Sequence, residues 1–448
     1  MSLSSADTIF ALASAPGRAG VAVLRLSGPG AGEAVRGLAG RADLPPPRRA
    51  VRCRLADPDS GAALDDGLMI WFPGPASFTG EDVAELHIHG GRATVEAVAE
   101  ALAARPGLRA AEPGEFSRRA FLAGKIDLTA AEAIADLVDA DTDAQRRQAL
   151  AQLRGGLSER METWRAALVD TLAYSEAWID FPDEDLPEEA AAGMRERIAG
   201  LAAEIRAFLD DNRRGERLRH GLQVAILGAP NVGKSSLLNA IAERDAAIVS
   251  ETAGTTRDII EVHLDLGGWP VTLADTAGLR EAPADGQGGI EREGVRRALA
   301  RADAADVRLV VFDAGAPPDP TSAALITEGT VPVFNKTDLG GSVPAEVAGI
   351  PAHAVSARTG AGLPDLLRLL EGWAADILEG SGAPLTRQRH RQALADCADA
   401  LGRAAAADAP ELAAEELRVA ARALGRVTGR VDVEDLLDVI FRDFCIGK

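Results

Sequence analysis

The segment Gly228-Ala-Pro-Asn-Val-Gly-Lys-Ser235 decides the fold of the central part of the chain. It follows the apolar run 222–227 and precedes the helix-like stretch 236–241, which predicts the order strand, phosphate loop and helix. Glycines in such a loop let backbone N–H groups converge on phosphates, Lys234 supplies a positive charge, and the Ser235 hydroxyl can bind Mg²⁺. The pattern predicts nucleotide binding and leaves the base undecided.

Three later segments complete the predicted nucleotide site, two of them at the base, and each follows an apolar, strand-like run. In Asp275-Thr-Ala-Gly278, the carboxylate can hold the water shell of the metal and the Gly278 N–H can sense a γ-phosphate. In Asn335-Lys-Thr-Asp338, the Asp338 carboxylate can accept hydrogen bonds from N1–H and the N2 amino group of guanine, a donor pair that adenine lacks. Ser356-Ala-Arg358 is expected to close over the base. Together these segments predict a G domain that binds and hydrolyses GTP.

The predicted hydrolytic machinery lacks one common part. Leu279 stands where many small GTPases carry the glutamine that orients the attacking water, so another group must do this. Gly254-Thr-Thr-Arg-Asp258 is typical of a mobile switch, with Thr256 as a second hydroxyl on Mg²⁺. Asn231, with backbone carbonyls of residues 250–255, can hold a monovalent cation where other GTPases use an arginine finger; a simple turn-forming role is the alternative.

Composition and charge limit the function classes. The 448 residues are 47% hydrophobic and 26% charged, which is typical of globular material in two to four domains. The formal net charge of −20 means that any nucleic-acid contact must be local. No apolar run reaches membrane length, and no basic residue precedes the first apolar stretch as in a secretory signal. Cys53, Cys397 and Cys445 are odd in number and lack metal-ligand spacing, so we expect a cytoplasmic protein.

The sequence pattern predicts three kinds of region along the chain. Residues up to about 120 alternate short β-like runs with Pro-Gly turns, which predicts an α+β domain. Helical patterning begins at the capping box Thr129-Ala-Ala-Glu132, continues to residue 209 and resumes after Pro384. The predicted fold class is therefore multidomain α/β and α+β: an N-terminal α+β domain and a split α-helical domain into which a P-loop α/β G domain is inserted.

Further segments along the whole chain match the pattern of a known family. They are Pro16-Gly-Arg-Ala-Gly-Val21, Leu24-Arg-Leu-Ser-Gly28, Phe72-Pro-Gly-Pro-Ala-Ser-Phe-Thr-Gly-Glu-Asp82, Pro113-Gly-Glu-Phe-Ser117, Ala131-Glu-Ala-Ile-Ala-Asp-Leu137, Ile179-Asp-Phe-Pro-Asp183, Gly254-Thr-Thr-Arg-Asp258, Asp275-Thr-Ala-Gly-Leu-Arg-Glu281 and Phe444-Cys-Ile-Gly-Lys448. With these segments the chain resembles the bacterial and organellar tRNA modification GTPase family MnmE, also called TrmE.

This resemblance implies a domain order, partners and a reaction. The implied domains are an N-terminal tetrahydrofolate-binding and dimerising domain (1–122), a first helical part (123–217), a potassium-dependent G domain (218–378) and a second helical part (379–448). Members form homodimers that join the FAD-dependent protein MnmG in a heterotetramer. They attach an aminomethyl or carboxymethylaminomethyl group to carbon 5 of the wobble uridine of certain tRNAs. The one-carbon unit comes from 5,10-methylenetetrahydrofolate, in whose place 5-formyltetrahydrofolate can bind.

The motifs and the resemblance together assign residues, and the K⁺ and folate residues are given by the resemblance. For GTP they are Asn231, Val232, Gly233, Lys234, Ser235, Ser236, Ser250, Glu251, Thr252, Ala253, Gly254, Thr255, Thr256, Asp275, Thr276, Ala277, Gly278, Asn335, Lys336, Asp338, Ser356, Ala357 and Arg358. For metals they are Ser235 and Thr256 on Mg²⁺, and Asn231, Ser250, Thr252 and Thr255 on K⁺. For the folate they are Arg25, Glu85, Lys125 and Lys448. Because Arg25 lies within an apolar strand-like run, we expect it to have a dedicated anionic partner, for which the folate is the candidate.

Some roles and functions stay open. The catalytic glutamate that orients water best matches Glu291, but the extra residues 283–289 leave Glu281 and Glu293 as alternatives. Cys445 is either catalytic or a packing residue of the C-terminal tail. One rival function is an RNA-binding ribosome-assembly GTPase, although nothing in the sequence resembles its usual basic RNA module. The other is a folate-dependent aminomethyl-transfer enzyme whose GTPase is regulatory.

Overall fold

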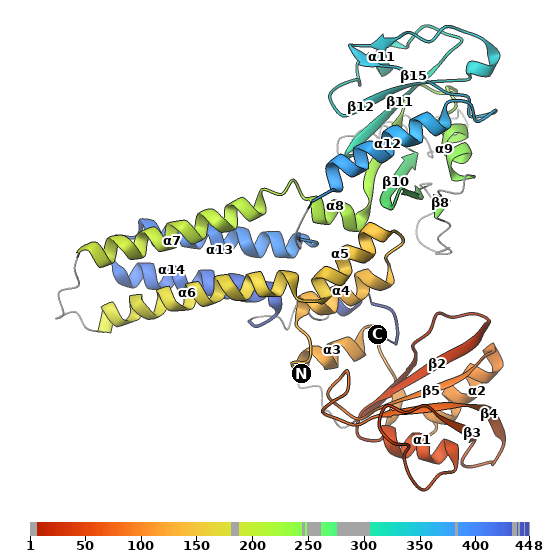
Figure 1. Cartoon of the computed structure of the whole chain (residues 1–448), viewed down its shortest axis with the longest axis vertical. Coiled ribbons are helices and arrows are strands. Elements are labelled where there is room, and N and C mark those ends of the chain that lie inside the picture. The colour runs from red at the N-terminus through yellow and green to blue at the C-terminus, as the bar shows by residue number, and fades with distance from the viewer. Residues whose placement is uncertain are drawn as a thin grey trace, which may run out of the picture. The chain divides into compact units, whose positions relative to one another are not determined.

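A computed structural model of the chain describes residues 7–180, 188–243, 247–248, 261–275, 305–380, 384–431, 437, 440–442 and 444–447. The chain forms two compact units, each built from separate stretches of sequence (Figure 1). The first unit comprises Met1–Ala135, Ser158–Pro182 and Ala409–Lys448, and the second comprises Asp136–Leu157 and Asp183–Asp408.

A six-stranded sheet forms the centre of the first unit. Its strand order is β3-β4-β5-β2-β1-β6, and all neighbours are antiparallel except β1 and β6. The strands are β1 (Thr8–Leu12), β2 (Ala19–Ser27), β3 (Val51–Ala56), β4 (Ala63–Phe72), β5 (Val83–Gly90) and β6 (Leu108–Ala110). Helices α1 (Ala31–Ala39) and α2 (Arg92–Ala103) pack with one face of this sheet through residues such as Leu24 and Leu86. Side chains alternate along a strand, so Arg25 and Glu85 lie on the opposite face.

An ionic cluster joins α3 (Glu115–Leu122) to this sheet. Arg109 on β6 donates two hydrogen bonds to the Glu115 carboxylate, at 2.6 and 2.8 Å, and Arg119 donates a third at 3.0 Å. The same two arginines also hold Asp7, and Arg119 reaches Glu81 at 3.1 Å. Burial alone would raise the pKa of Glu115, but the hydrogen bonds from Arg109 and the Glu112 N–H outweigh it and lower that pKa. The cluster therefore holds a buried, ionised carboxylate between helix and sheet.

The remaining described helices of the first unit are α4 (Leu128–Val138, its last residues in the second unit), α6 (Gly156–Asp180) and α14 (Pro410–Thr428). Phe441 and Phe444, whose ring centroids lie 5.0 Å apart, pack in one cluster with Leu128 of α4. A Cβ atom on Gly447 would lie 2.3 Å from the Leu12 carbonyl oxygen. The C-terminal tail is therefore docked on α4 and on the end of β1.

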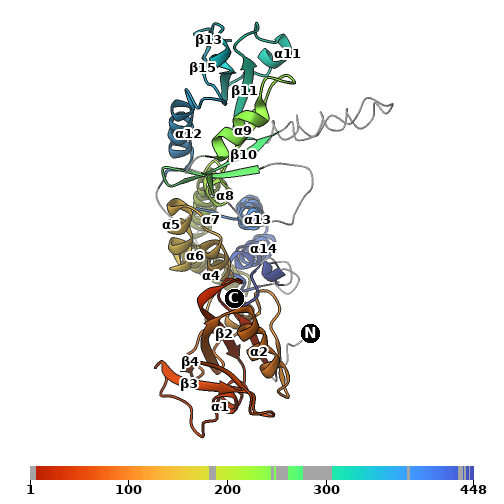
Figure 2. The same cartoon turned by 90° about the vertical axis from the view of Figure 1, so that its right-hand side faces the viewer.

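The second unit contains a seven-stranded sheet in the order β15-β12-β11-β7-β10-β9-β8. The strands are β7 (Leu222–Leu227), β8 (Ala247–Ile248), β9 (Glu261–Leu266), β10 (Trp269–Asp275), β11 (Val307–Asp313), β12 (Thr330–Asn335) and β15 (His353–Ala354); β13 (Glu346–Val347) and β14 (Ile350–Pro351) form a separate pair. From β15 to β10 all neighbours are parallel, so their carboxyl ends meet at one edge. Helices α9 (Lys234–Ala242) and α12 (Leu363–Leu378) both pack on β10 (Figure 2). The short helices are α11 (Pro320–Ala323) and the 3₁₀ turn η1 (Thr337–Leu339).

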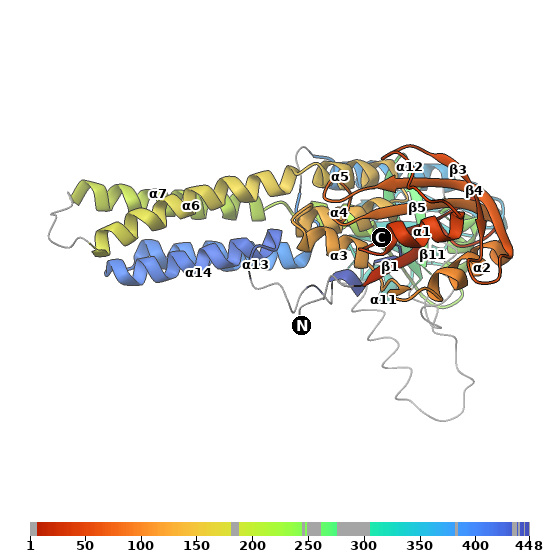
Figure 3. The same ribbon diagram turned by 90° about the horizontal axis from the view of Figure 1, so that it is seen from below.

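Helices from both flanks of this sheet pair with each other. Helix α7 (Glu188–Leu209) precedes the sheet and packs along α13 (Gln388–Ala406), which follows it (Figure 3). A guanidinium N–H of Arg206 donates to the Ala398 carbonyl oxygen at 3.0 Å across this pair. The predicted fold class, with a P-loop α/β domain between two helical segments, is confirmed. None of the helices in the described ranges combines the length and apolar character that crossing a bilayer requires.

Helix α8 (Arg214–His220) brings the chain from α7 into the sheet. Gln148 of α5 (Asp143–Leu153) donates to the Gly215 carbonyl oxygen at 3.1 Å, and Arg217 pairs with Asp306 before β11 at 2.8 Å. The returning chain passes the same point, because a Cβ atom on Gly215 would lie 2.4 Å from the Leu385 carbonyl oxygen. The two passages between the helical segments and the sheet therefore touch.

Candidate functional site

The phosphate loop follows β7, and its backbone shape depends on glycine at two positions. Gly228 has φ +138°, and a Cβ atom there would lie 2.3 Å from the Val311 carbonyl oxygen. Gly233 has φ +93°, and a Cβ atom would lie 2.4 Å from the Asn335 amide nitrogen. Any side chain at either position would push the loop away from its neighbouring strands. The loop reaches the N-terminus of α9, where backbone N–H groups favour phosphate.

The predicted phosphate-binding residues lie together at this loop. Lys234 is buried, and its ammonium donates to the carbonyl oxygens of Gly228 and Ala229 at 2.9 and 2.8 Å. Val232 is in the hydrophobic core, whereas Ser235 and Ser236 are exposed on the first turn of α9. Asn231 is exposed in the left-handed region with φ 64°. This arrangement can present a cation, hydroxyls and helix N–H groups to phosphates and a metal ion.

The predicted base-recognition residues lie at the carboxyl ends of β12 and β15. Asn335 is buried, and its amide nitrogen donates to the carbonyl oxygens of Val232 and Gly233 at 3.1 and 3.3 Å. Its side-chain oxygen accepts a hydrogen bond from the Ala357 N–H at 3.0 Å. Asn335 therefore ties the phosphate loop to the segment Ser356-Ala-Arg358.

Asp338 is oriented by its neighbours. The Ser356 hydroxyl, which is buried, donates to Asp338 Oδ1 at 2.6 Å and accepts from the Thr359 N–H at 3.2 Å. Arg358 is exposed and approaches Asp338 Oδ2 at 3.9 Å. The carboxylate is therefore fixed on one side by Ser356, which leaves Oδ2 to face a base.

Asp313 belongs to this cluster but was not predicted from the sequence. The Lys336 ammonium lies 2.8 Å from Asp313 Oδ2, at the end of β11, and donates to the Asn231 carbonyl oxygen at 2.6 Å. The hydrogen bond from Lys336, together with the Gly315 N–H, lowers the pKa of Asp313. The available signal was the position of Asp313 at the end of an apolar run, at the same edge as the other strand ends.

Several predicted residues lie outside the described residues. They are Ser250, Glu251, Thr252, Ala253, Gly254, Thr255, Thr256, Thr276, Ala277, Gly278, Glu281, Glu291, Glu293 and Lys448. Asp275 ends β10 and is the register partner of Ile226 on β7, so its backbone lies beside the start of the phosphate loop.

The predicted folate residues of the first unit lie on β2, β5 and after α3. The Arg25 guanidinium is paired with the Glu85 carboxylate at 3.1 Å and lies 5.8 Å from the centroid of the Phe116 ring. The other Glu85 oxygen lies 3.3 Å from Nε2 of His87. Lys125 is exposed, with its stem beside Gly80. The anionic partner of Arg25 in the structure is thus Glu85. Because Arg25 is already paired, its need for an anionic partner does not support folate binding.

Cys445 is exposed in the docked C-terminal tail, and its carbonyl oxygen accepts from the Gly114 N–H at 3.4 Å. Burial raises the pKa of the Cys53 thiol and raises that of Cys397 to about 12, so both are inert packing residues. Among the described residues, no cluster of three His, Cys, Asp or Glu side chains is suited to hold a metal ion.

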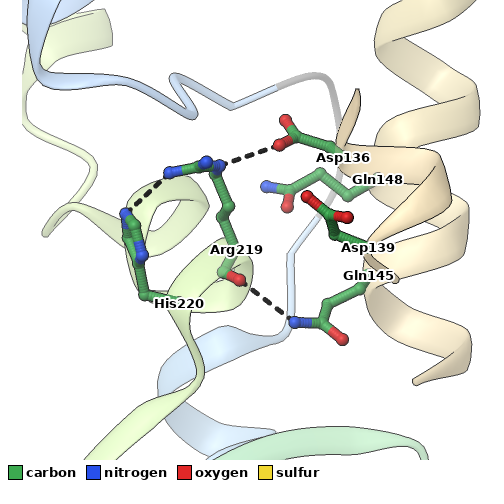
Figure 4. Close-up of a pocket in the computed structure, with 6 residues that line it drawn as sticks. All are labelled: Asp136, Asp139, Gln145, Gln148, Arg219 and His220. Carbon is green, nitrogen blue, oxygen red and sulfur yellow. Dashed lines mark hydrogen bonds and ion pairs between the residues drawn. The ribbon is translucent and has the colours of Figure 1, made fainter. Parts of the chain in front are cut away.

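The second unit also has a cavity of about 80 Å³ beside α8 (Figure 4). Its lining residues are Asp136, Asp139, Gln145, Gln148, Arg219 and His220. Arg219 pairs with Asp136 at 2.8 Å, lies 2.9 Å from Nε2 of His220, and accepts from Gln145 through its carbonyl oxygen at 3.0 Å. None of the predicted site residues lines this cavity.

Comparisons with known proteins agree over the whole chain. Residues 8–125 match the family "GTP-binding protein TrmE N-terminus", and residues 128–445 match the family "MnmE helical domain". A relative from Parvibaculum lavamentivorans, described as a tRNA modification GTPase MnmE, is 59% identical over 99% of this chain and 100% of its own length. Another of the same description, from Paramagnetospirillum magneticum, is 58% identical over 99% and 100%. The G domain of the T. maritima FeoB iron transporter is 26% identical over 34% of this chain and 98% of its own, with a TM-score of 0.27.

Proposed function

The chain belongs to the tRNA modification GTPase family MnmE, and on this premise we propose a fuller activity for it. Together with a flavoprotein partner, MnmG, it installs the (carboxymethyl)aminomethyl group at carbon 5 of the wobble uridine of certain tRNAs. It takes the one-carbon unit from 5,10-methylenetetrahydrofolate, and its GTPase depends on K⁺. It works as a homodimer in the cytoplasm.

One observation carries the GTPase half of this proposal. The phosphate loop with Lys234, the segment from Asn335 to Asp338 and the segment around Ala357 are separate in the sequence but meet at the carboxyl edge of one sheet, linked by the hydrogen bonds of Asn335. Ligands bind at this edge in open α/β sheets. Lys234 exchanges the carbonyl oxygens that it now contacts for phosphate oxygens when GTP binds. Ser235 and Thr256 are the residues that would hold Mg²⁺, which would neutralise charge on the phosphates.

We propose the domain bounds that the family resemblance implies. Residues 1–122 form the folate-binding domain, residues 123–217 and 379–448 form the two parts of the helical domain, and residues 218–378 form the G domain that binds GTP. The pairing of α7 with α13 supports this division, because these helices come from the two sides of the proposed G domain.

Analysis of tRNA nucleosides from a strain lacking the protein tests the proposed function. We expect the modified wobble uridines to disappear, to return with the wild-type protein, and to stay absent with Lys234→Ala. Intact wobble uridines together with unprocessed ribosomal RNA would instead favour a ribosome-assembly GTPase. Restoration by Lys234→Ala would show that the GTPase is dispensable for the modification.

K⁺ should stimulate GTP hydrolysis at least about tenfold over Na⁺ at equal ionic strength, because a cation held at Asn231 can stabilise the charge that develops in the transition state. Asn231→Ala should abolish most of this difference. Asn239→Ala, with an exposed side chain on α9, is the matched control and should keep the K⁺ response. Equal rates in the two salts would refute the proposed cation site.

Glu291→Ala should lower GTP hydrolysis by about 10²-fold while leaving GTP affinity near the wild-type value, since a water-orienting group acts in the chemical step. Single-turnover hydrolysis and nucleotide titration separate the two effects. If Glu281→Ala or Glu293→Ala is the slow variant, the role belongs to that residue.

The full-length protein should bind 5-formyltetrahydrofolate without nucleotide, because Arg25 offers a cation and Glu85 an acceptor on the sheet face opposite α1 and α2, and Lys125 offers a second, exposed cation after α3. Calorimetric titration should show weaker binding for Arg25→Ala and Lys125→Ala. Arg92→Ala, an exposed arginine on α2, is the control. If both site variants bind the folate with wild-type affinity, the folate does not bind at this surface. If a folded dimer of the wild-type protein does not bind the folate, the proposed folate-dependent step is wrong.

A further inference from the structure

We infer that Asp313 is a positioning residue for guanine-nucleotide binding, which holds the Lys336 ammonium against the phosphate loop and so joins the loop that binds phosphates to the loop that binds the base. This role concerns GTP and GDP binding and is independent of the proposed folate and tRNA chemistry.

The conformation of Lys336 shows that its position is imposed by its neighbours. Its φ is 66°, a left-handed conformation that long side chains seldom adopt. Such residues persist where surrounding contacts determine them, and they concentrate at binding sites. The Lys336 ammonium contacts Asp313 Oδ2 at 2.8 Å and donates to the Asn231 carbonyl oxygen at 2.6 Å.

Asp313 is itself rigidly placed. It is the last residue of β11 and the register partner of Asn335 on β12. Its Oδ1 accepts from the Gly315 N–H at 2.9 Å, and the Ala314 N–H donates to the Asn335 carbonyl oxygen at 2.9 Å. Its lowered pKa keeps the carboxylate ionised at neutral pH. The carboxylate is therefore a fixed anion beside the base-binding segment.

The contacts of Lys336 with Asp313 and with the Asn231 carbonyl oxygen should raise the affinity for the nucleotide. Asn335 links the base segment to Val232 and Gly233, and Lys336 adds a second link at Asn231. A pocket whose two halves are already joined loses less conformational freedom when the ligand binds. The side chains of Asp313 and Lys336 are 30% and 31% exposed, so their pairing contributes little to folding. Its effect belongs to nucleotide binding rather than to the stability of the fold.

Asp313→Asn tests this inference, because the amide keeps the shape and the acceptor for Gly315 but loses the charge. Stopped-flow displacement of a fluorescent GDP analogue should show release about fivefold faster, the size of coupling found between contacting residues. KM for GTP should rise more than kcat falls, and the melting temperature without nucleotide should stay unchanged. Asp365→Asn removes an exposed carboxylate paired with Arg368 on α12, and it should release GDP at the wild-type rate.

A double-variant cycle separates positioning from a general loss of charge. Lys336→Met should accelerate GDP release as much as or more than Asp313→Asn. The combined variant should be no faster than Lys336→Met alone, because Asp313 acts through Lys336. Wild-type release by Asp313→Asn would overturn the inference. Additive effects in the double variant would overturn it as well, since they would show that Asp313 acts separately from Lys336.

Discussion

Asp338→Asn should shift the nucleotide preference of the protein from GTP to XTP by about 10³-fold or more. A site built to hydrogen-bond its substrate discriminates strongly against a partner that leaves buried polar groups unpaired. The wild-type carboxylate accepts from N1–H and the N2 amino group of guanine, whereas xanthine carries a carbonyl oxygen at the second position. An amide N–H suits that carbonyl and opposes the amino group.

The surroundings of Asp338 strengthen this expectation, because they set which way the amide of the variant faces. The Ser356 hydroxyl accepts from the Thr359 N–H and donates to Asp338 Oδ1, so it continues to require an acceptor there. The amide nitrogen of the variant is then placed where Oδ2 was, toward the base.

Affinities of the wild type and Asp338→Asn for GTP and XTP provide the measurement. Ser356→Ala combined with Asp338→Asn is the informative control. Without the Ser356 hydroxyl nothing orients the amide, so the gain in XTP affinity should be smaller. Retained GTP affinity in Asp338→Asn would mean that another residue reads the base.

Glu115→Ala should destabilise the first unit by about 3 kcal/mol, the lower end of what removing one partner of a buried ion pair costs. The Glu115 side chain is 5% exposed, and the change leaves the guanidinium of Arg119 without one of its carboxylates. The urea midpoint of tryptophan fluorescence should fall by about 1 M. Glu96→Ala removes an exposed partner of Arg92 on α2 and should leave the midpoint unchanged. Equal midpoints for the two variants would show that the buried cluster contributes nothing.

The effect of Glu115 should also depend on pH. Its pKa, like that of Asp7, is lower in the folded state than in the unfolded chain, where a glutamate titrates near about 4.3. The stabilisation is therefore fully present above that value and is lost as the pH falls through the folded-state pKa. The difference between wild type and Glu115→Ala should be constant at neutral pH and shrink below about pH 4.

The sequence predicts well those parts of the site whose residues are close together along the chain. Strand, glycine loop and helix around Lys234 are contiguous, so their chemistry can be read before the fold is known. The parallel strands then bring Asp338 and Ser356 to the same edge without further information.

Contacts that depend on register or on packing between distant segments were beyond prediction. Arg25 finds Glu85 because β2 and β5 pair in one register, and a shift of one residue would place Glu85 on the other face. Asp313 reaches Lys336 only because β11 and β12 end level with each other. Arg119 lies four residues after Glu115 on α3, a spacing that the sequence shows, whereas Arg109 lies on β6 and no spacing indicates that it reaches Glu115.

The close passage of Gly215 and Leu385 has a topological consequence. A segment that leaves and returns at one point can be removed, replaced or reconnected without stretching the rest of the chain. A short turn between α7 and α13 would then complete a continuous helical hairpin, and joining the two ends of the excised segment would close it into a ring at a small entropic cost. The linear order of the elements in this protein is therefore one of several that its three-dimensional contacts permit.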